Sequence, residues 1–313
     1  MPPADRIEHD APRIALATVA QGWAEDDDAP ALVAALEAAG AWAGPAEWDD
    51  PAVDWAAFDL VVVRSTWDYA ERPDEFVAWA HRVGSLTTLI NPPAVLEWNI
   101  DKRYLGALAA RGCRVVPTAF VGPGEDPAPV VEGMPPGEVV VKPTISAGSK
   151  DTVRHPAERR DDAVAHARSL LAAGRSVMVQ PYLPAVDRVG ETGMVYLDGE
   201  LSHAFRKGPL LTPGGEPVEG LFAREEIEPR AAAADERAVA EDVLAAAVAE
   251  LGVDRLAYAR VDLLRDADDR PVLLELELTE PSFFLETDPG AAARAAECFV
   301  AHARRAKAAR SGS

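Results

Sequence analysis

Two stretches in the C-terminal third of the chain carry charged side chains at every second position. The first holds Arg260 and Asp262, and the second holds Glu275 and Glu277. Because alternate side chains of a strand share one face, a hairpin with all four on the same face would gather three carboxylates and one guanidinium. Carboxylate oxygens are ligands that select Mg²⁺ or Mn²⁺. The same pattern is also typical of the solvated face of an ordinary strand, so both interpretations stay open here.

A lysine followed by a loop of small residues is a second candidate for chemistry. Lys142 ends the apolar segment EVVVKP, and Ser146, Gly148 and Ser149 come in the loop after it. Glycine and serine let backbone N–H groups approach phosphate oxygens, and the lysine adds a point charge. Neither GxxxxGK[ST] nor GxGxxG occurs in the chain. The segment is therefore either a phosphate-binding loop or an ordinary turn.

The run RSTWDY stands directly after the apolar segment DLVVV and supplies candidates for substrate binding. They are Arg64, Ser65, Thr66, Trp67, Asp68 and Tyr69. Arg64 can pair with a carboxylate and Asp68 with an ammonium, while the two aromatic rings can exclude water, so the run suits a small zwitterion. The alternative is an ion pair between Arg64 and Asp68 beside two packing rings. The segment TEPSFF, with Glu280 and Ser282, is expected to close the opposite side of the pocket.

The elements that must position these residues begin with an alternation of strands and helices. Apolar runs predict strands at 13–19, 59–63 and 88–90, and amphipathic patterns predict helices at 31–39 and 74–83. Such alternation favours a parallel sheet, in which residues just past the carboxyl end of a strand line the ligand crevice. The RSTWDY run occupies such a position in the predicted N-terminal α/β domain.

The rest of the chain has shorter strands mixed with helices, which is an α+β pattern. Strands are predicted at 114–121, 138–143, 176–183, 194–205, 257–264 and 271–278, and helices at 96–112, 162–173, 231–251 and 289–307. The dipeptide Asp198-Gly199 within the fourth of these segments is a strong signal for a hairpin turn. The polar stretch 265–270 is expected to be the turn between the last two strands.

The ordered set of motifs resembles the ATP-grasp superfamily. In chain order the set reads NIDK ending at Lys102, VVVKP with Lys142, the loop of small residues, VQPYL with Gln180, Arg206, RVD from Arg260 and ELE from Glu275. D-alanine–D-alanine ligase and glutathione-synthetase-like members show these elements in the same order, here over roughly residues 91–300. Taken singly, Lys102, Arg206 and Lys207 would be ordinary surface charges. The resemblance implies an ATP-grasp fold, in which an N-terminal α/β domain precedes two α+β subdomains that hold ATP between them.

The resemblance also implies a role for each matching residue. The cofactor-binding set would be Lys102 and Lys142 on the phosphates, Ser146, Gly148 and Ser149 in the closing loop, Gln180 and Leu183 at adenine, Asp187 at the ribose, and Tyr182 and Lys207 beside them. Arg260 and Arg206 would be the catalytic residues that clamp the transition state. Asp262, Glu275 and Glu277 would hold the metal. Glu277 stands where the family usually has Asn, and the added carboxylate should strengthen Mg²⁺ binding.

The activity implied by the resemblance is the ATP-dependent, ADP-forming ligation of a carboxylate to an amine. The carboxylate attacks the γ-phosphorus of ATP to give an acyl phosphate, which a nitrogen nucleophile then displaces. ATP and two Mg²⁺ ions, for which Mn²⁺ can substitute, are the expected cofactors. The RSTWDY run and the ELELTEPS stretch look most like the cycloserine-forming subgroup, which cyclises O-ureido-D-serine. The alternatives are an intermolecular amino-acid or peptide ligase of the glutathione-synthetase kind and a non-catalytic ATP-binding regulatory protein.

The domain boundaries expected from these patterns divide the chain into four parts. They are a flexible arm at 1–12, the N-terminal domain at 13–92, an ATP-grasp domain at 93–308 and a tail at 309–313. Within the ATP-grasp domain, the lid subdomain is expected at about 113–183 and the C-terminal subdomain at about 184–308.

The chain of 313 residues is strongly acidic, with 31 Lys and Arg against 52 Asp and Glu and a formal net charge of −21. This excess argues against a nucleic-acid or anionic-membrane surface, because both need clustered cations. We expect a small, amino-acid-like substrate and the homodimer that family members often form. Cys113 and Cys298 lie far apart and outside any CxxC pattern, which argues against a disulfide framework or a thiolate metal site. That cysteine usage, with acids where a signal peptide needs an apolar core, favours the cytoplasm.

Overall fold

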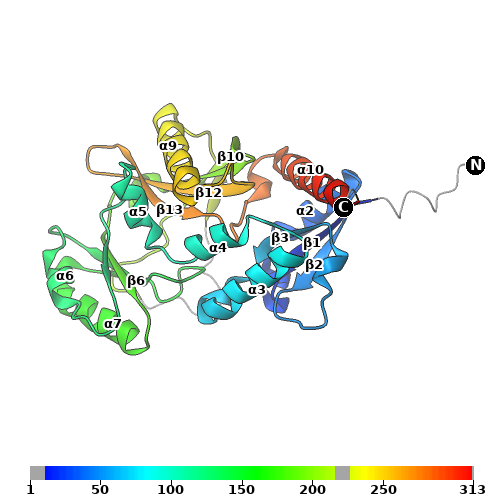
Figure 1. The fold of residues 1–313 in the computed structure, drawn as a ribbon. Coiled ribbons are helices and arrows are strands. Elements are labelled where there is room, and N and C mark those ends of the chain that lie inside the picture. Colours follow the sequence, from blue (N-terminus) through cyan, green and yellow to red (C-terminus); the bar gives the residue numbers. More distant parts are fainter. Residues whose placement is uncertain (1–10, 216–225, 312–313) are drawn as a thin grey trace, which may run out of the picture.

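The computed structural model describes residues 11–215 and 226–311, which form three sheets with helices packed on them (Figure 1). The sheet nearest the N-terminus is parallel, and the other two are antiparallel. This combination confirms the predicted α/β and α+β fold class.

The N-terminal sheet has the strand order β2-β1-β3-β4. Its strands are β1 Arg13–Thr18, β2 Trp42–Glu47, β3 Leu60–Ser65 and β4 Thr88–Ile90, and its first helices are α1 Ala20–Glu25, α2 Ala29–Ala38 and α3 Pro73–Leu86. Apolar clusters cover both faces of β1 and β3, as is usual for a parallel sheet. The sequence did not predict β2, because its segment WAGPAE contains glycine and proline, which are depleted in strands. An edge position tolerates the proline.

The second sheet corresponds to the predicted lid and is antiparallel, in the order β5-β8-β6-β7. Its elements are β5 Ala119–Val121, α6 Ala128–Gly133, β6 Val139–Pro143, β7 Val153–His155, α7 Arg160–Ala172 and β8 Val177–Pro181. Val131, Ala167 and Leu170 pack the two helices into one apolar cluster with this sheet. The strand predicted at 114–121 is shorter than expected, because Pro117 has no N–H to donate to a sheet.

The third sheet has the order β11-β10-β9-β12-β13 and is antiparallel throughout. Its elements are α8 Val186–Val189, β9 Glu191–Leu197, β10 Glu200–Lys207, β11 Ile227–Pro229, α9 Ala234–Leu251, β12 Tyr258–Arg265 and β13 Pro271–Glu277. The predicted hairpin turn is confirmed, since Asp198 and Gly199 alone connect β9 to β10. Their φ values of 49° and 85° lie in the left-handed region that a two-residue hairpin turn requires.

One predicted helix is interrupted. In place of a single helix over 96–112, the chain forms α4 Pro93–Asn99 and α5 Tyr104–Ala110 with a turn between them. In this turn the Lys102 N–H donates to the carbonyl oxygen of Thr144 at 2.8 Å, and the lysine is buried. The interruption therefore attaches the backbone of Lys102 to the lid.

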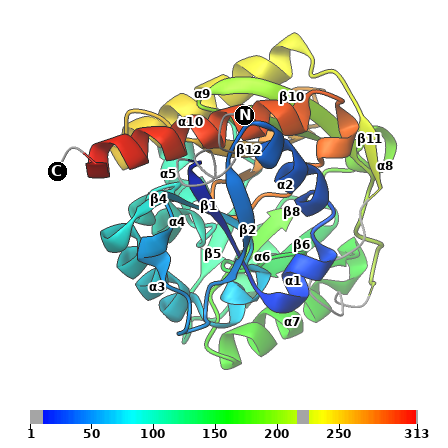
Figure 2. The same cartoon turned by 90° about the vertical axis from the view of Figure 1, so that its right-hand side faces the viewer.

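The last helix, α10 Ala291–Ser311, returns to the N-terminal sheet. Its residues Phe299 and Ala303 share one buried cluster with Leu32 and Leu36 of α2. Figure 1 shows α10 beside α2, and Figure 2 shows α10 running across the upper part of the molecule, below α9 in that view. The same cluster includes Tyr258 of β12, so α10 packs against both the first and the third sheet.

This packing bears on the expected boundary at the C-terminal end of the chain. The C-terminal helix completes the N-terminal unit, although it follows the predicted ATP-grasp segment 93–308 in sequence. Residues 309–311 were expected in the tail but continue α10. Residues 312–313 of the tail and 1–10 of the expected arm lie outside the described residues.

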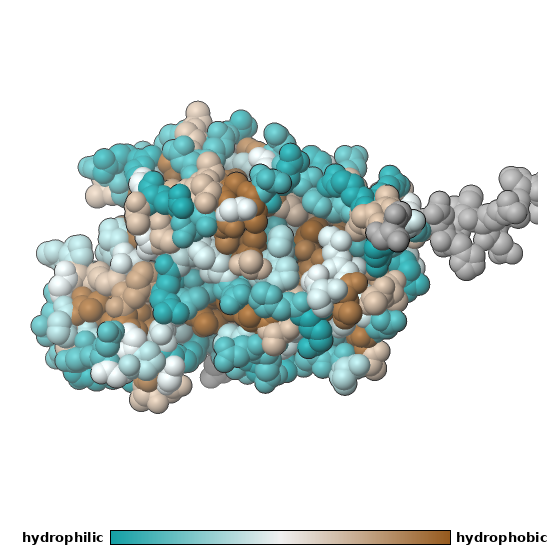
Figure 3. Space-filling model, viewed as in Figure 1, coloured by the Kyte–Doolittle hydropathy of each residue, from teal (hydrophilic) through white to brown (hydrophobic). Residues whose placement is uncertain are grey.

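Hydrophobic side chains pack within the units and between them. On the face shown in Figure 3, hydrophilic residues dominate the outermost surface, and hydrophobic residues gather in the furrows between the parts of the molecule. Within residues 11–215 and 226–311, no helix is both long and apolar enough to cross a membrane.

Candidate active site

A cavity of about 460 Å³ is lined by residues from all three sheets and their loops. The predicted residues that line it are Trp67, Tyr69, Lys102, Lys142, Ser146, Gly148, Ser149, Gln180, Tyr182, Leu183, Lys207, Arg260, Glu275, Glu277, Glu280 and Ser282. The fold thus gathers residues that are dispersed over most of the sequence. The predicted residues that do not line it are Arg64, Ser65, Thr66, Asp68, Asp187, Arg206 and Asp262.

The hairpin of β12 and β13 forms the charged floor of the cavity. Arg260 stands opposite Glu277 and Asp262 opposite Glu275, so the four side chains share one face, as the alternation predicts. Arg260 Nη2 lies 2.8 Å from Asp262 Oδ2 and also contacts Glu277. The alternative of a solvated strand face is wrong, because Arg260 and Asp262 are only 5% and 1% exposed.

Two buried lysines approach this floor from the lid side. Lys102 Nζ lies 3.0 Å from Glu275 Oε1 and donates to the carbonyl oxygen of Ser146 at 2.7 Å. Burial acts to lower the pKa of Lys102, but the carboxylates of Glu275, Glu277 and Glu280 together outweigh it, so its pKa is raised. Lys142 lines the same cavity, and there burial keeps the pKa of the ammonium below its ordinary value. Lys102 therefore links the floor to the loop of the lid.

A third lysine reaches the floor from β10. Lys207 Nζ lies 3.1 Å from Asp262 Oδ2 and 2.6 Å from Glu191 Oε1. Gly193 of β9 is paired with Asp262, and a Cβ at this position would lie 3.1 Å from Asp262 Oδ1 and 2.3 Å from the ring of Phe205. Glycine thus lets three strands meet around the carboxylate. Asp262 lies behind the residues that line the floor, where its carboxylate holds the Lys207 ammonium in place.

The three floor carboxylates differ in their affinity for a proton. Burial acts to raise the pKa of Asp262 and Glu275, but the cations beside them outweigh it, so both pKa values lie below their ordinary range. Burial raises the pKa of Glu277 to about 8; Arg260 opposes this rise and the other two carboxylates add to it. The cations of the chain therefore do not fully offset the negative charge of Glu277.

This donor set fits a divalent cation. Glu275 and Glu277 line the cavity with side chains 23% and 25% exposed, so their oxygens are accessible from it. Asp262 lies behind them within its ion pairs. Oxygen ligands of this kind suit Mg²⁺, and an added positive charge would offset the repulsion that raises the pKa of Glu277.

The loop after β6 closes one side of the cavity with Ser146, Gly148 and Ser149, as predicted. Gly148 and Ser149 have φ values of 61° and 60°, and two successive left-handed residues turn the backbone sharply. Lys150 of this loop forms an ion pair with Glu71 of the N-terminal unit. The loop thus bridges the lid and the N-terminal unit across the cavity.

Strand β8 and the residues after it form the more apolar end of the cavity. Gln180, Tyr182 and Leu183 line this end, as predicted. Asp187, which the resemblance placed at a ribose, does not line it. Its carboxylate accepts hydrogen bonds from the Tyr182 hydroxyl and from Arg154, because α8 directs it toward them and away from the cavity.

Arg206 does not reach the cavity, which contradicts its predicted catalytic role. Successive side chains of a strand point to opposite faces, so Arg206 and Lys207 of β10 diverge. Arg206 Nε donates to the carbonyl oxygen of Val189 at 3.0 Å, and Nη1 lies 3.2 Å from Glu228 Oε2. The adjacent lysine occupies the site in its place.

Arg64 is a structural residue of the N-terminal unit and is 1% exposed. Its Nη2 lies 3.3 Å from Asp26 Oδ1 and 3.1 Å from Asp28 Oδ2. Nη1 donates to the carbonyl oxygen of Pro281 at 2.9 Å, and the guanidinium lies 4.5 Å from the centre of the Phe283 ring. These partners surround the cation, so the predicted pairing with a substrate carboxylate is wrong.

The next residues of the run divide between the core and the cavity. Ser65 and Thr66 are fully buried, which excludes the substrate contact predicted for them. Ser65 belongs to β3 and is 2.7 Å, Oγ to Oγ1, from Thr18 of the neighbouring strand. Trp67 and Tyr69 line the cavity as predicted.

Asp68 also has structural partners. Its carboxylate accepts a hydrogen bond from Trp48 Nε1 at 2.9 Å and forms an ion pair with Arg72. Neither the predicted contact with a substrate ammonium nor the alternative ion pair with Arg64 is present. The cause is the short helical turn from Trp67 to Glu71, which aims Asp68 away from the cavity.

Tyr69 and Glu280 both line the N-terminal wall of the cavity, where the tyrosine is buried and the carboxylate is partly exposed. Burial raises the pKa of Tyr69 well above its ordinary value. Burial also raises the pKa of Glu280 to about 7, while the tyrosine hydroxyl acts in the opposite direction. Glu280 can therefore gain or lose a proton near neutral pH. Ser282 lines the same wall, and its carbonyl oxygen accepts from Arg260 at 3.0 Å.

Three further residues organise the site without any sign in the local sequence. The Asp28 carboxylate accepts from the backbone N–H of Phe283 at 2.6 Å, 255 positions along the chain. Asn99 Oδ1 accepts from the N–H of Leu278 at 2.7 Å, across 179 positions. Glu191 holds Lys207, as described above. Only the tertiary structure brings these partners together, although an acid within a DDD triplet before a helix is at least a sign of capping.

Known proteins resemble this chain over nearly its whole length. The family described as "D-cycloserine synthetase DcsG, N-terminal domain" matches residues 14–91. Cycloserine biosynthesis protein DcsG of Streptomyces lavendulae is 43% identical over 294 residues, which are 92% of this chain and 97% of that protein. The crystal structure of D-cycloserine synthetase DcsG matches with a TM-score of 0.87 at 41% identity, over 93% of this chain and 99% of the other.

The same fold occurs in a more distant enzyme. D-alanine–D-alanine ligase from Bacillus anthracis, solved in complex with ATP, matches with a TM-score of 0.67 at 15% identity, over 96% of this chain and 100% of the other. The predicted ATP-grasp resemblance is thus confirmed, and so is its cycloserine-forming subgroup. The protein is an ATP-dependent ligase, and the alternative of a non-catalytic regulator is not favoured. On the evidence of relatives that match almost all of its length, the chain belongs to the D-cycloserine synthetase DcsG family of ATP-grasp ligases.

Proposed function

We propose that this protein cyclises O-ureido-D-serine to D-cycloserine while converting ATP to ADP and phosphate. The observation that carries the proposal is the 43% identity to a cycloserine biosynthesis protein over 294 residues. The cavity supports it, because a single space of about 460 Å³ is lined by cations at its floor and by aromatic and acidic residues at its N-terminal wall.

The proposed reaction closes a ring within one molecule. The substrate carboxylate attacks the γ-phosphorus of ATP, and the resulting acyl phosphate is attacked at carbon by the ureido nitrogen that is bonded to oxygen. Phosphate leaves as the carbon–nitrogen bond forms. Comparing the atoms of O-ureido-D-serine and D-cycloserine shows that the carbamoyl group must also leave, as carbon dioxide and ammonia. One water is consumed as ATP becomes ADP and phosphate, so ammonia and ADP should form in equal amounts.

We assign the transferring phosphoryl group to the cations of the floor. Arg260 is the proposed catalytic residue, because its guanidinium lines the cavity and is held in a fixed direction by Asp262 and the carbonyl of Ser282. Lys102, Lys142 and Lys207 approach the same space from the lid side and from β10. Such preorganised charges stabilise the phosphoryl oxygens in the transition state.

The remaining nucleotide contacts fall on the lid and on the strand after it. We propose that Ser146, Gly148 and Ser149 close over the phosphates, and that Gln180, Tyr182 and Leu183 hold the adenine. We further propose that Glu275 and Glu277, with Asp262 behind them, hold two Mg²⁺ ions, for which Mn²⁺ can substitute. Bound there, such ions neutralise charge on the phosphates.

The substrate is assigned to the N-terminal wall. Trp67, Tyr69 and Ser282 line this wall together with Glu280. The carboxylate of Glu280 is suited to an ammonium group, because a positive charge beside it would lower its raised pKa and favour the ionised form. Since the nucleophile belongs to the same molecule as the carboxylate, no second amine site is required.

The test is a comparison of substrates with Mg-ATP and the purified full chain. ADP, ammonia and product mass are measured with O-ureido-D-serine, its L form, single amino acids and amino-acid pairs. We expect ADP and ammonia in equal amounts with O-ureido-D-serine, and a product with the mass of cycloserine. ADP formed only with an amino-acid pair, and a product mass equal to their sum less water, would establish an intermolecular ligase instead.

Two further properties remain predictions from the family resemblance. We propose that the protein forms a homodimer, which light scattering of the purified chain would test. We also propose a cytoplasmic location, which fractionation of the producing cells would test.

A further inference from the structure

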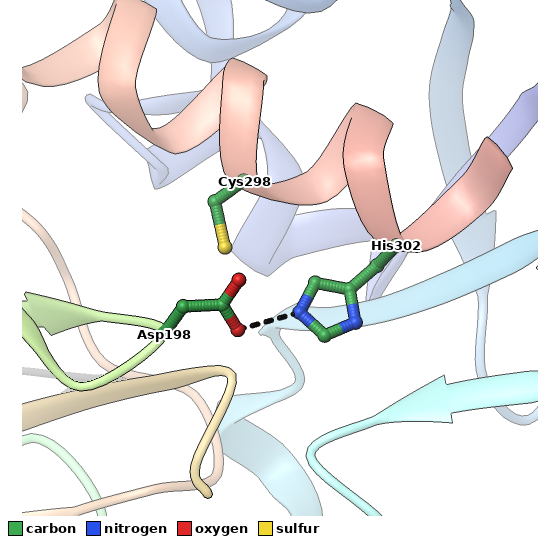
Figure 4. A group of neighbouring side chains, drawn as sticks. All are labelled: Asp198, Cys298 and His302. Carbon is green, nitrogen blue, oxygen red and sulfur yellow. Dashed lines mark hydrogen bonds and ion pairs between the residues drawn. The ribbon is translucent and has the colours of Figure 1, made fainter. Parts of the chain in front are cut away.

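A cluster outside the active site brings together three different kinds of metal ligand. One ligand atom from each of Asp198, Cys298 and His302 lies within 4.8 Å of the others. Figure 4 shows the carboxylate, the thiol and the imidazole directed into the same space, with the last two coming from α10. None of the three lines the active-site cavity.

Regular geometry on both sides holds these side chains together. Cys298 and His302 are four positions apart on a long helix and therefore share one face of it. Asp198 stands in the two-residue turn between β9 and β10, where its N–H donates to the carbonyl oxygen of Ala257 at 2.9 Å. Cys298 Sγ lies 3.6 Å from the same carbonyl oxygen. The turn and the helix are thus anchored at a common backbone group.

The three side chains of the cluster have the chemistry of cation ligands. His302 Nε2 lies 2.8 Å from Asp198 Oδ1. Burial raises the pKa of the Cys298 thiol to about 12, so the thiol keeps its proton and is not an activated nucleophile. A metal ion is the group that deprotonates a thiol in such surroundings.

The ligand types select the metal. Thiolate sulfur, imidazole nitrogen and carboxylate oxygen are together the ligands of Zn²⁺, which is tetrahedral and takes a water where the protein supplies three ligands. Mg²⁺ and Ca²⁺ prefer oxygen alone. One thiolate and one carboxylate balance the two charges of the ion, and imidazole binds neutral. The loaded cluster would then carry no net charge, which suits side chains that are only 18–23% exposed at His302 and Asp198.

We propose that Asp198, Cys298 and His302 bind one Zn²⁺ ion per chain, with water in the fourth position, and that the ion fastens α10 to the β9–β10 hairpin. As the sulfur–zinc bond forms, the thiol proton passes to solvent. The ion would join the third sheet to the helix that completes the N-terminal unit. The sequence pattern concealed this site, because the third ligand lies 100 positions before Cys298, outside any CxxC or CxxxH spacing rule.

Cobalt provides the most specific probe of the site. Co²⁺ is titrated into the metal-free full chain, and absorption is followed in the near ultraviolet and the visible range. We expect one equivalent to give a thiolate-to-cobalt charge-transfer band and the strong visible bands of tetrahedral cobalt. The floor carboxylates of the active site can also take Co²⁺, but they contain no sulfur and give no such band.

Matched variants identify the ligands. Cys298→Ser should abolish the charge-transfer band, whereas Cys113→Ser should leave it intact, because Cys113 Sγ is near only the backbone oxygen of Asp242, at 3.9 Å. A band that persists in Cys298→Ser, or that never appears in the unchanged protein, would overturn the proposal.

Zinc affinity is then measured by competition with a chromogenic chelator. His302→Ala and Asp198→Asn should each weaken binding by about 100-fold or more, beyond the 10–100-fold loss typical of groups that only support a ligand. Asn tolerates the left-handed turn, so Asp198→Asn keeps the fold. His81→Ala, which removes an exposed histidine paired with Glu97, should change nothing.

Thermal unfolding gives an independent readout. Zn²⁺ should raise the melting temperature of the unchanged protein, because an ion that binds only the folded state stabilises it. The rise should disappear in Cys298→Ser. Equal zinc affinity in all of these variants would show that the three residues do not form the site.

Discussion

The floor of the cavity and its N-terminal wall contain similar residue types, but their charged side chains point in different directions. On the floor, Arg260, Glu275 and Glu277 alternate along two paired strands and line the cavity, with Asp262 on the same strand face behind them. On the wall, the RSTWDY run leaves a strand and enters a short helical turn. Arg64 there is buried within the N-terminal unit, and Trp67 and Tyr69 reach the cavity. A continuous strand fixes the direction of every side chain, whereas a strand end does not.

The difference also concerns what each charge does. The floor cations pair with acids that the cavity exposes in part, so these charges remain available to a ligand. The cation of the wall is enclosed by Asp26 and Asp28, both of which are buried. Variants of the floor should therefore alter chemistry, whereas variants of the wall should alter stability and leave the chemistry nearly unchanged.

The largest effect is expected from Arg64→Met. The change keeps much of the side-chain volume but leaves two buried carboxylates without their cation. Breaking a buried ion pair in this way costs about 3–5 kcal/mol, so the free energy of unfolding in urea should fall by that amount. The protein that remains folded should bind substrate with an unchanged KM.

Arg72→Met is the matched control for that experiment. Arg72 pairs with Asp49 and Asp68, but its side chain is 33% exposed. Exposed pairs contribute about 1 kcal/mol or less, so this variant should be nearly as stable as the unchanged protein. Small and equal losses in both variants, together with a raised substrate KM in Arg64→Met, would return Arg64 to the substrate site.

The next effect in size is expected from Arg260→Ala on the floor. Removing one preorganised charge from a transition state costs about 10²–10³ in kcat. ATP binding should stay nearly intact, because Lys102, Lys142 and Lys207 remain. Stopped-flow turnover and equilibrium binding of a non-hydrolysable ATP analogue measure the two quantities separately.

Arg206→Ala is the control on the opposite face of β10. Since Arg206 lies outside the cavity, its loss should leave kcat close to that of the unchanged protein. A loss of kcat in Arg206→Ala as large as that in Arg260→Ala would restore the catalytic role that the family resemblance assigned to it. An equal loss of ATP binding and kcat in Arg260→Ala would make that residue structural.

The comparison also shows how far a sequence can predict a site. Strand alternation predicted the common face of Arg260, Asp262 and the two glutamates, because period two is a property of the backbone itself. The direction of Arg206 was the failure on this side, since a family motif gives positions but does not by itself tell which of two adjacent cations faces the ligand. The prediction named the adjacent Lys207 as well, so it located the correct segment of β10 but assigned the catalytic role to the residue on the wrong face of that strand.

The wall could not be predicted in the same way. The partners of Arg64 are Asp26 and Asp28, 38 and 36 positions away, and no local pattern connects them. The longer strands and helices followed from apolar periodicity. The sequence did not predict β2, whose glycine and proline hide it, the break before Tyr104, or the short elements α1, α6, β7 and β11, which span too few residues for a periodic signal. Long-range hydrogen bonds such as that from Leu278 to Asn99 lie beyond any periodic argument.

A smaller effect is expected from Tyr69→Phe, which tests the part of the wall that does reach the cavity. The Tyr69 hydroxyl acts to lower the pKa of Glu280 and so favours its ionised form, and removing it should raise the pKa of Glu280 above about 7. A hydrogen bond to a charged group contributes about 1.5–3 kcal/mol, and 1.36 kcal/mol corresponds to one pKa unit. The acidic limb of kcat/KM should therefore move to higher pH by about one unit.

The pH dependence of the free energy of unfolding gives the direction of the same pKa shift of Glu280 independently. The folded-state pKa of Glu280 lies above its ordinary value, so its contribution to stability is complete at acidic pH and is lost as the pH rises through about 7. In Tyr69→Phe this loss should continue to higher pH, because its upper limit is set by the folded-state pKa. Tyr196→Phe is the control, because among the described residues the Tyr196 hydroxyl has no hydrogen-bond partner. A pH profile that moves equally in both variants would show that the Tyr69 hydroxyl has no specific role.

The smallest effect is expected from Asp68→Asn. Asparagine still offers an oxygen to the indole N–H of Trp48 and loses only the charge that pairs with Arg72. That pair is partly exposed, so the free energy of unfolding should fall by less than about 1 kcal/mol. The KM for the substrate should not change, because the carboxylate faces away from the cavity. If KM rose about tenfold, or 1.4 kcal/mol, at unchanged stability, the short helical turn would have to rearrange on substrate binding. The wall would then share the floor's property of presenting its charges to the ligand, and the contrast between the two regions would hold only for the ligand-free protein.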